Sequence, residues 1–148
     1  LELLLKHGAD PNLRNERGQT PLNYGDLRRL VHRTVSSLRK MGINRNDRVA
    51  IVLPNGPEMA TTFISVAAGA TAAPLNPNYR SEEFSFYLQD LNARVLLVEK
   101  GSDSEAIHVA KSLDVPVHEI WVDEEAPAEE DDPIGAGYSV LHRREAFA

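Results

Sequence analysis

Residues 48–57 read RVAIVLPNGP, and this stretch decides the fold of the chain. Its first six residues form a short and nearly uninterrupted apolar run, which is typical of a strand buried on both faces of a parallel sheet. The segment 54–56 has the residues of a tight turn. Pro57 suits the first position of a helix, where its missing N–H is not needed. The stretch therefore predicts a strand, a turn and a helix in succession.

The same alternation continues toward the C-terminus. Helices are predicted where apolar residues recur at helical spacing, and strands where short apolar runs are bounded by turn residues. The order is β-α-β-α-β-α-β, so we expect an α/β fold with a parallel sheet covered by helices and right-handed crossovers. The second strand is weak because Pro74 cannot donate to a ladder. The later elements are a helix at 58–69, a strand at 71–75, a helix at 81–91 capped by Ser81, a strand at 93–99, a helix from Ser102 or Ser104 to Leu113, and a strand at 117–122.

Another helix is predicted before the first strand. Asn23 can cap its N-terminus, with Asp26 three residues on as in a capping box. Gly42 suits the position just after its last turn. We expect its basic residues to lie on a solvated surface. The apolar face comprises Leu27, Leu30, Val31, Thr34, Leu38 and Met41, and the basic residues off that face are Arg28, Arg29, Arg33, Arg39 and Lys40.

The composition fits one domain with a core, since 42% of the 148 residues are hydrophobic. The absence of cysteine excludes disulfides, thiolate catalysis and cysteine metal sites. Seven of the 22 acidic residues lie in 123–132, which we interpret as a solvated linker, and the remainder is nearly neutral. No stretch approaches the roughly 20 apolar residues of a membrane helix, and residues 1–6 are a poor signal peptide. We therefore expect a cytoplasmic protein that binds neither nucleic acid nor membrane.

Residues 1–22 carry a different pattern. They contain LLL at 3–5, HGADPN at 7–12, Gly18 and TPL at 20–22. This segment resembles the junction between ankyrin repeats, a family whose period is about 33 residues. Only part of one period is present, no second copy follows, and Asn23 stands where the family usually has histidine. Because stacked repeats share a core, the resemblance implies the end of an upstream array or an appended fragment.

Three ordered stretches carry a second resemblance. They are YGDL at 24–27, DRVAIVLPN at 47–55 and AGATAAPLNP at 68–77. Together they resemble the N-terminal part of the adenylate-forming acyl-CoA synthetases, a family that binds AMP as part of its reaction. The continuation, with EEF at 82–84 and FYL at 86–88, resembles the branch that contains oxalate–CoA ligases.

The second resemblance implies an enzyme that forms an acyl-adenylate from ATP and then transfers the acyl group to CoA. That chemistry needs a Gly- and Ser/Thr-rich phosphate loop with a lysine, an acidic residue for Mg²⁺ or ribose, and a late catalytic lysine. The chain has no such loop, and its lysines stand in none of these contexts. We therefore predict no catalytic, cofactor-binding or metal-binding residue in it. The four lysines are Lys6, Lys40, Lys100 and Lys111.

Four other groups of residues could suggest a site, and each has a structural explanation. The turn at 54–57 precedes a helix N-terminus, which is a generic anion site, but we expect Asn55 to cap that helix. Glu82 and Glu83 diverge on a helix, so the charge preference of a helix start explains them. Residues 135–137 read GAG but lack the strand and third glycine of a dinucleotide motif. The five histidines, which lack metal-ligand spacing, are His7, His32, His108, His118 and His142.

The two patterns meet at Leu22. They divide the chain into a partial ankyrin repeat (1–22), a truncated N-terminal subdomain of an acyl-CoA synthetase (23–125), and an acidic linker and tail (126–148) that could include a short helix. The first hypothesis is a fragment or fusion product of an ATP-dependent acid–CoA ligase. It would be inactive without its missing remainder, while the complete family uses ATP, Mg²⁺ and CoA. The alternative is a non-enzymatic protein–protein interaction module of ankyrin type. A third reading is that the junction is an artefact of gene prediction or of protein design.

Overall fold

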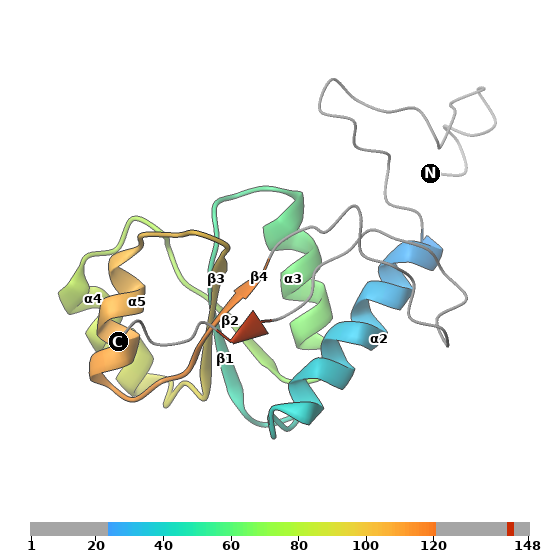
Figure 1. The fold of residues 1–148 in the computed structure, drawn as a ribbon, viewed down its shortest axis with the longest axis horizontal. Helices are drawn as coiled ribbons and strands as arrows, with labels where there is room; N and C mark the ends of the chain where they lie inside the picture. Colours follow the sequence, from blue (N-terminus) through green and yellow to red (C-terminus); the bar gives the residue numbers. More distant parts are fainter. Residues whose placement is uncertain (1–23, 121–141, 144–148) are drawn as a thin grey trace.

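The computed structural model describes residues 24–120 and 142–143 (Figure 1). Their strands form one five-stranded sheet with the spatial order β2-β1-β3-β4-β5. The first four strands are parallel, and β5 pairs antiparallel with β4. The predicted fold class, a helix-covered parallel sheet, is therefore confirmed. The strands are β1 (Arg48–Val52), β2 (Thr71–Pro74), β3 (Val95–Glu99), β4 (Val117–Ile120) and β5 (His142–Arg143).

In the part of the chain that the structure describes, four helices cover the two faces of the sheet (Figure 1). The pair α2 and α3 packs together on one face, and the pair α4 and α5 packs together on the other. The three layers follow from the connections, because each crossover between parallel strands must return over one face. The helices are α2 (Tyr24–Lys40), α3 (Pro57–Ala67), α4 (Ser81–Asp90) and α5 (Glu105–Ser112).

Strands β1 and β3 lie side by side at the centre of the sheet. Their register pairs Val49 with Val95 and continues to Val52 with Val98. All four residues from Val95 to Val98 are buried, as are the residues from Val49 to Leu53. Alternate side chains therefore contact opposite helical layers, which is why these strands are apolar at every position and not only at every second one.

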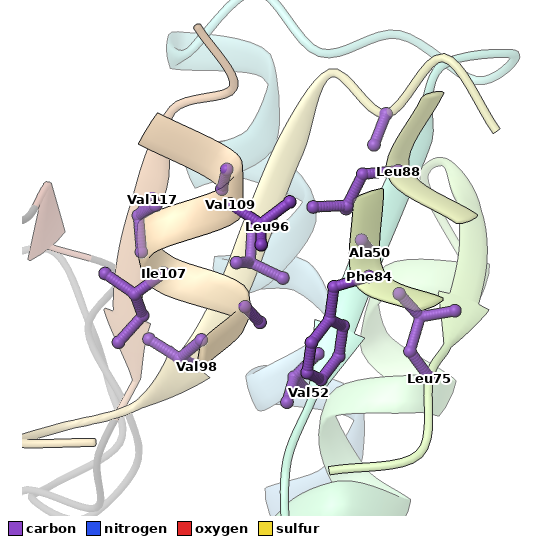
Figure 2. Close-up of a cluster of buried hydrophobic side chains, with 13 residues drawn as sticks. Ala50, Val52, Leu75, Phe84, Leu88, Leu96, Val98, Ile107, Val109 and Val117 are labelled. Carbon is purple, nitrogen blue, oxygen red and sulfur yellow. The ribbon is translucent and has the colours of Figure 1, made fainter. Parts of the chain in front are cut away.

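The first half of the core lies between the sheet and the α4–α5 layer. Figure 2 shows Phe84 and Leu88 of α4 pointing toward strand residues, with Ile107 and Val109 of α5 beside them. Phe84 is fully buried and is the largest of these side chains. The strand residues on this face are Ala50, Val52, Leu96, Val98 and Val117.

The second half of the core lies between the sheet and the α2–α3 layer. Its helical residues include Leu38 of α2 and Val66 of α3, both fully buried. The strand residues on this face are Val49, Ile51, Val95, Leu97 and Ile120. The predicted apolar face of α2 is confirmed at Leu30, Thr34 and Leu38, which are buried.

Helix α2 closely approaches the backbone at Gly69, two residues after the end of α3. A Cβ built on Gly69 would lie 2.8 Å from Cγ2 of Val35 on α2, so no larger residue fits without movement. Arg39 reinforces the same junction, because its guanidinium donates to the carbonyl oxygens of Ile43 and Gly69. Arg39 is exposed, as predicted for the basic residues of this helix, but its side chain also joins the end of α2 to the turn before β2.

Several predicted helix ends are corrected by the structure. The residue before the first turn of α4 is Arg80, whose N–H donates to Glu83 Oε2 at 3.0 Å, and Ser81 is the first helical residue. Helix α3 starts after Gly56 with no side-chain cap, so Asn55 does not cap it. Ser104 does cap α5 and accepts from the Ala106 N–H at 3.3 Å.

Other expectations concern the ends of the described chain and the sheet edge. Gly42 follows α2 with φ of 77°, as expected for a residue that ends a helix. The weak strand β2 lies at the sheet edge, where Pro74 is tolerated. Residues 142–143 form strand β5, whereas the sequence predicted a tail with at most a short helix at 126–148. Asn23, the acidic run and residues 1–22 lie outside the described residues.

A hydrogen-bonded contact joins the N-termini of α4 and α5. The Ser81 hydroxyl and the Ser81 N–H both donate to Glu105 Oε2, each at 2.7 Å. These bonds stabilise the carboxylate and lower the pKa of Glu105 below its ordinary value of 4.5, with smaller contributions from Arg80 and His108. The contact fixes the two helix starts beside the carboxyl-terminal ends of the strands.

The close approach at Gly69 predicts a coupled stability change. Gly69→Ala should lower the free energy of unfolding by about 1–3 kcal/mol, because the new methyl group overlaps Val35. In a Val35→Ala background, the same substitution should cost much less. Denaturant unfolding of the four proteins gives the coupling energy.

Gly42→Ala is the matched control. It should cost about 1 kcal/mol through its left-handed backbone alone, because no atom lies within 4 Å of the new methyl position. That cost should be the same with Val35 or Ala at position 35. Equal costs of Gly69→Ala in both backgrounds would contradict the proposed steric contact.

The Ser81–Glu105 contact predicts a pH dependence. The folded-state pKa of Glu105 lies below its unfolded value, so the unfolded chain binds more protons between the two values. The stability from this contact is complete above the unfolded pKa and is lost as pH falls through the folded pKa. Ser81→Ala should raise the pKa of Glu105 and weaken the loss of stability on the acid side. A carboxyl NMR titration measures this shift.

Ser85→Ala serves as the control for that titration. Ser85 lies on the same helix, and its hydroxyl accepts from Gln89 Nε2 and not from any group near Glu105. It should leave the pKa of Glu105 unchanged. A Ser81→Ala protein with an unaltered pKa at Glu105 would rule out this explanation.

Candidate functional site

The carboxyl-terminal edge of the parallel sheet is where this fold places a site. The chain passes from β1 to β2 on one side and then crosses to β3 on the other side of β1. The order therefore reverses between β1 and β3, and open α/β sheets bind ligands outside such a switch point. Three loops follow strands at this edge, at the top of Figure 1: 53–56, 75–80 and 100–104.

The loop after β1 brings backbone groups to this edge, but few reactive side chains. Leu53 is buried, whereas Asn55 and Gly56 are exposed. Pro57 is the first residue of α3, as predicted, and Glu58 lies in its first turn. The Glu58 carboxylate occupies the space next to Gly56, with Oε2 3.1 Å from a Cβ built there. An acidic group at this helix start makes it a poor place for an anion.

The loop after β3 is held by local hydrogen bonds. The Gly101 N–H donates to Glu119 Oε1 at 3.3 Å, and the Ser104 N–H donates to the Ser102 hydroxyl at 3.3 Å. Gly101 has φ of 75°, which lets the chain turn away from β3 toward α5. Lys100 is the cation of this loop and is exposed.

The loop after β2 leads into an aromatic cluster on α4. Tyr79 stacks on Tyr87 with ring centroids 5.1 Å apart and meets Phe84 edge-on at 5.8 Å. Its hydrogen bond with Tyr87 raises the pKa of the Tyr79 phenol above the ordinary value of 10. Asn76 starts the loop by accepting from the Asn78 N–H. These contacts orient the loop, and sequence periodicity gave no signal for them.

The other predicted candidates lie apart from one another. His32 and His108 are exposed on α2 and α5, and His118 is buried in β4. Lys40 and Lys111 are exposed in the last turns of two helices on opposite faces of the sheet. Glu83 serves the start of α4, as expected from its position. Residues 6, 7 and 135–137 lie outside the described part of the chain, and of residue 142 only the backbone is described.

The chemistry available at this edge is limited. In residues 24–120 and 142–143, no group of three or more His, Asp or Glu side chains could hold a metal ion. None of the helices in these ranges is long and apolar enough to cross a membrane. The three loops offer exposed amides at Asn55, Asn76 and Asn78, the cations Arg80 and Lys100, and backbone groups. These groups can bind a ligand, but in the described residues they form no acid–base or nucleophilic constellation. The prediction that the chain has no site residue stays a prediction.

Known proteins similar to this chain are enzymes several times longer. The chain is 37% identical over 117 residues to an oxalate–CoA ligase of Arabidopsis thaliana, which covers 78% of the chain and 23% of that protein. It is 46% identical over 59 residues to the oxalate–CoA ligase of Saccharomyces cerevisiae, covering 39% of the chain and 11% of that protein. The chain thus spans less than a quarter of these two relatives.

A solved structure supports the same fold. The structure of apo MatB from Rhodopseudomonas palustris superposes with a TM-score of 0.61 at 20% identity, covering 75% of this chain and 23% of that one. At this identity the likeness concerns the fold alone.

The sequence family described as AMP-binding enzyme matches residues 5–143. This match extends into residues 5–22, where the sequence predicted a partial ankyrin repeat, and that repeat stays a prediction. The match covers most of the chain and includes every described strand and helix. The chain therefore belongs to the AMP-binding enzyme family and corresponds to the N-terminal part of its domain.

Proposed function

We propose that this chain is a part of an ATP-dependent acid–CoA ligase and that it does not catalyse the reaction by itself. The observation that carries the proposal is the family membership together with the 23% of the Arabidopsis oxalate–CoA ligase that the chain spans. The complete enzyme would join a carboxylic acid to AMP from ATP and then to CoA. This chain would supply a folded sheet layer of that enzyme.

The site geometry supports the lack of independent activity. Adenylate formation depends on several groups that converge on phosphate and stabilise its charge. At the switch-point edge, Lys100 is the one lysine of the three described loops, and the other exposed polar side chains there include Asn55 and Arg80. No Gly- and Ser/Thr-rich phosphate loop with a lysine occurs anywhere in the sequence. ATP and CoA binding therefore belong to the complete ligase in this proposal.

Mg²⁺ is assigned to the same complete enzyme. The described residues contain no cluster of carboxylates and histidines that would fit it. Among acids, oxalate is the first candidate, since two relatives are named oxalate–CoA ligases. A cytoplasmic location and the absence of nucleic-acid and membrane partners belong to the same proposal.

A second candidate function is a protein–protein interaction module. It is favoured by three large apolar side chains that remain exposed, Phe63, Ile64 and Phe86. An ankyrin-type leader at 1–22 would serve the same role in this candidate. Two measurements separate the candidates: light scattering coupled to chromatography gives the oligomeric state, and a pull-down detects a bound partner. A monodisperse monomer that captures no partner argues against the interaction module.

The lack of activity is tested by acid-dependent ATP–pyrophosphate exchange on the purified 148-residue chain. With oxalate as the acid and Mg²⁺ present, we expect exchange no faster than in the blank without protein. The complete Arabidopsis relative serves as the positive control for the assay. Acid-dependent exchange by the chain alone, retained through repeated purification, would contradict the proposal.

A further inference from the structure

Helix α3 is apolar on two opposite faces. Its inner face packs on α2 and the sheet through Met59 and Val66, and the buried Ser65 lies beside Val66 in the sequence. Its outer face carries a second apolar row at positions 60, 63, 64, 67 and 68, the i, i+3, i+4 spacing of one helical face. We call this row the α3 outer stripe. It comprises Ala60, Phe63, Ile64, Ala67 and Ala68, all of them exposed.

The α3 outer stripe is unlike the solvent face of the helix beside it. Phe63 is 41% exposed and Ile64 is 46% exposed, although both side chains are large. The eleven residues of α3 include one charged side chain, Glu58 at the first turn. The outer face of α2, in contrast, carries arginines and a lysine. An exposed row of apolar side chains of this kind is typical of a surface that contacts another protein layer.

The neighbouring edge of the sheet, strand β2, is also partly exposed and uncharged. Strand β2 follows α3 and contacts it, and it is the outermost strand on its side of the sheet. Thr71 and Pro74 of β2 are exposed, and the strand carries no charged residue that would protect an edge from pairing. The α3 outer stripe and β2 thus adjoin on the side of the molecule away from β4.

We propose that the α3 outer stripe is a docking face for the part of an AMP-binding enzyme that this chain does not match. This inference rests on the proposed function. The occupant would be an apolar layer of that remaining part, packed against Phe63 and Ile64. The stripe would then be the inner surface of a larger domain, and α3 would be covered on both faces.

The length of the relatives favours this occupant. The chain covers 23% of the Arabidopsis oxalate–CoA ligase and 23% of the apo MatB structure, so most of each enzyme is available to cover it. The lack of charge along the stripe fits an apolar protein layer and not a charged ligand. A second copy of this chain is the competing occupant, and the experiment below separates the two.

The absence of cysteine permits a direct test by thiol labelling. Phe63→Cys and Ile64→Cys are made one at a time in the full chain and in the full chain joined to the unmatched part of the Arabidopsis ligase. Labelling is followed by mass spectrometry of the peptide that carries the new thiol. We expect the labelling rate at each position to fall by about tenfold or more in the joined protein, because a buried thiol reacts only after local opening.

Phe86→Cys is the matched control. Phe86 is 63% exposed on α4, on the opposite face of the sheet, and its labelling rate should change by less than about twofold. Rapid labelling of Phe63→Cys in the joined protein would overturn the proposal, as would equal protection at all three positions. Protection that grows with the concentration of the isolated chain would also overturn it, in favour of a second copy.

Acid-dependent ATP–pyrophosphate exchange is also measured on the joined protein, so that the docking face and the proposed ligase function are tested separately. Protection of Phe63→Cys without exchange would support the docking face while counting against the proposed ligase function. Exchange without protection would support the ligase function and overturn the docking face.

Discussion

Burial of β1 and β3 on both faces is the constraint on which the rest of the structure depends. The pairing from Val49–Val95 to Val52–Val98 places eight apolar residues in the middle of the sheet. Parallel strands of this kind cannot leave one face in water, so a helical layer is required on each side. The α2–α3 and α4–α5 layers meet that requirement. Both layers pack tightly: a Cβ on Gly69 would overlap Val35 of α2, and Phe84 of α4 is fully buried.

The same constraint shapes the composition of this chain. Its apolar residues form a complete core around the sheet, while the loops at the carboxyl-terminal edge carry few chemical groups. Asn55 and Lys100 lie on loops that follow neighbouring strands, but no described acid, base or metal cluster joins them. The chain belongs to a family of larger enzymes, and one apolar face of helix α3 is exposed in it. In our proposal, the part of the relatives that this chain does not match would account for both features.

The sequence predicted the parts of the fold that depend on local pattern. The run RVAIVL predicted β1, Pro57 marked the start of α3, and Ser104 marked the cap of α5, because each signal lies within a few residues. Contacts between distant segments escaped prediction. Arg39 bonds to Gly69 thirty positions away, and Ser81 bonds to Glu105, so neither could be recognised before the helices were placed in space.

The candidate site was harder to predict than the fold. Asn55 was predicted to cap helix α3 because asparagine is common at the N-cap position, but the N-cap residue of α3 is Gly56. The exposed apolar row on α3 was hidden in a sequence that reads simply as a helix of small and apolar residues. Only the packing of Ser65 and Val66 inward shows that Phe63 and Ile64 point away from the core.

Residue-resolved amide hydrogen exchange of the full chain tests the central claim most directly, namely that a doubly covered pair of strands lets this part fold by itself. The account predicts that the amides of Ala50, Ile51, Leu96 and Leu97 exchange slowest, with opening free energies that match the global free energy of unfolding. Uniformly fast exchange, or β1 and β3 amides less protected than those of α2, would contradict it.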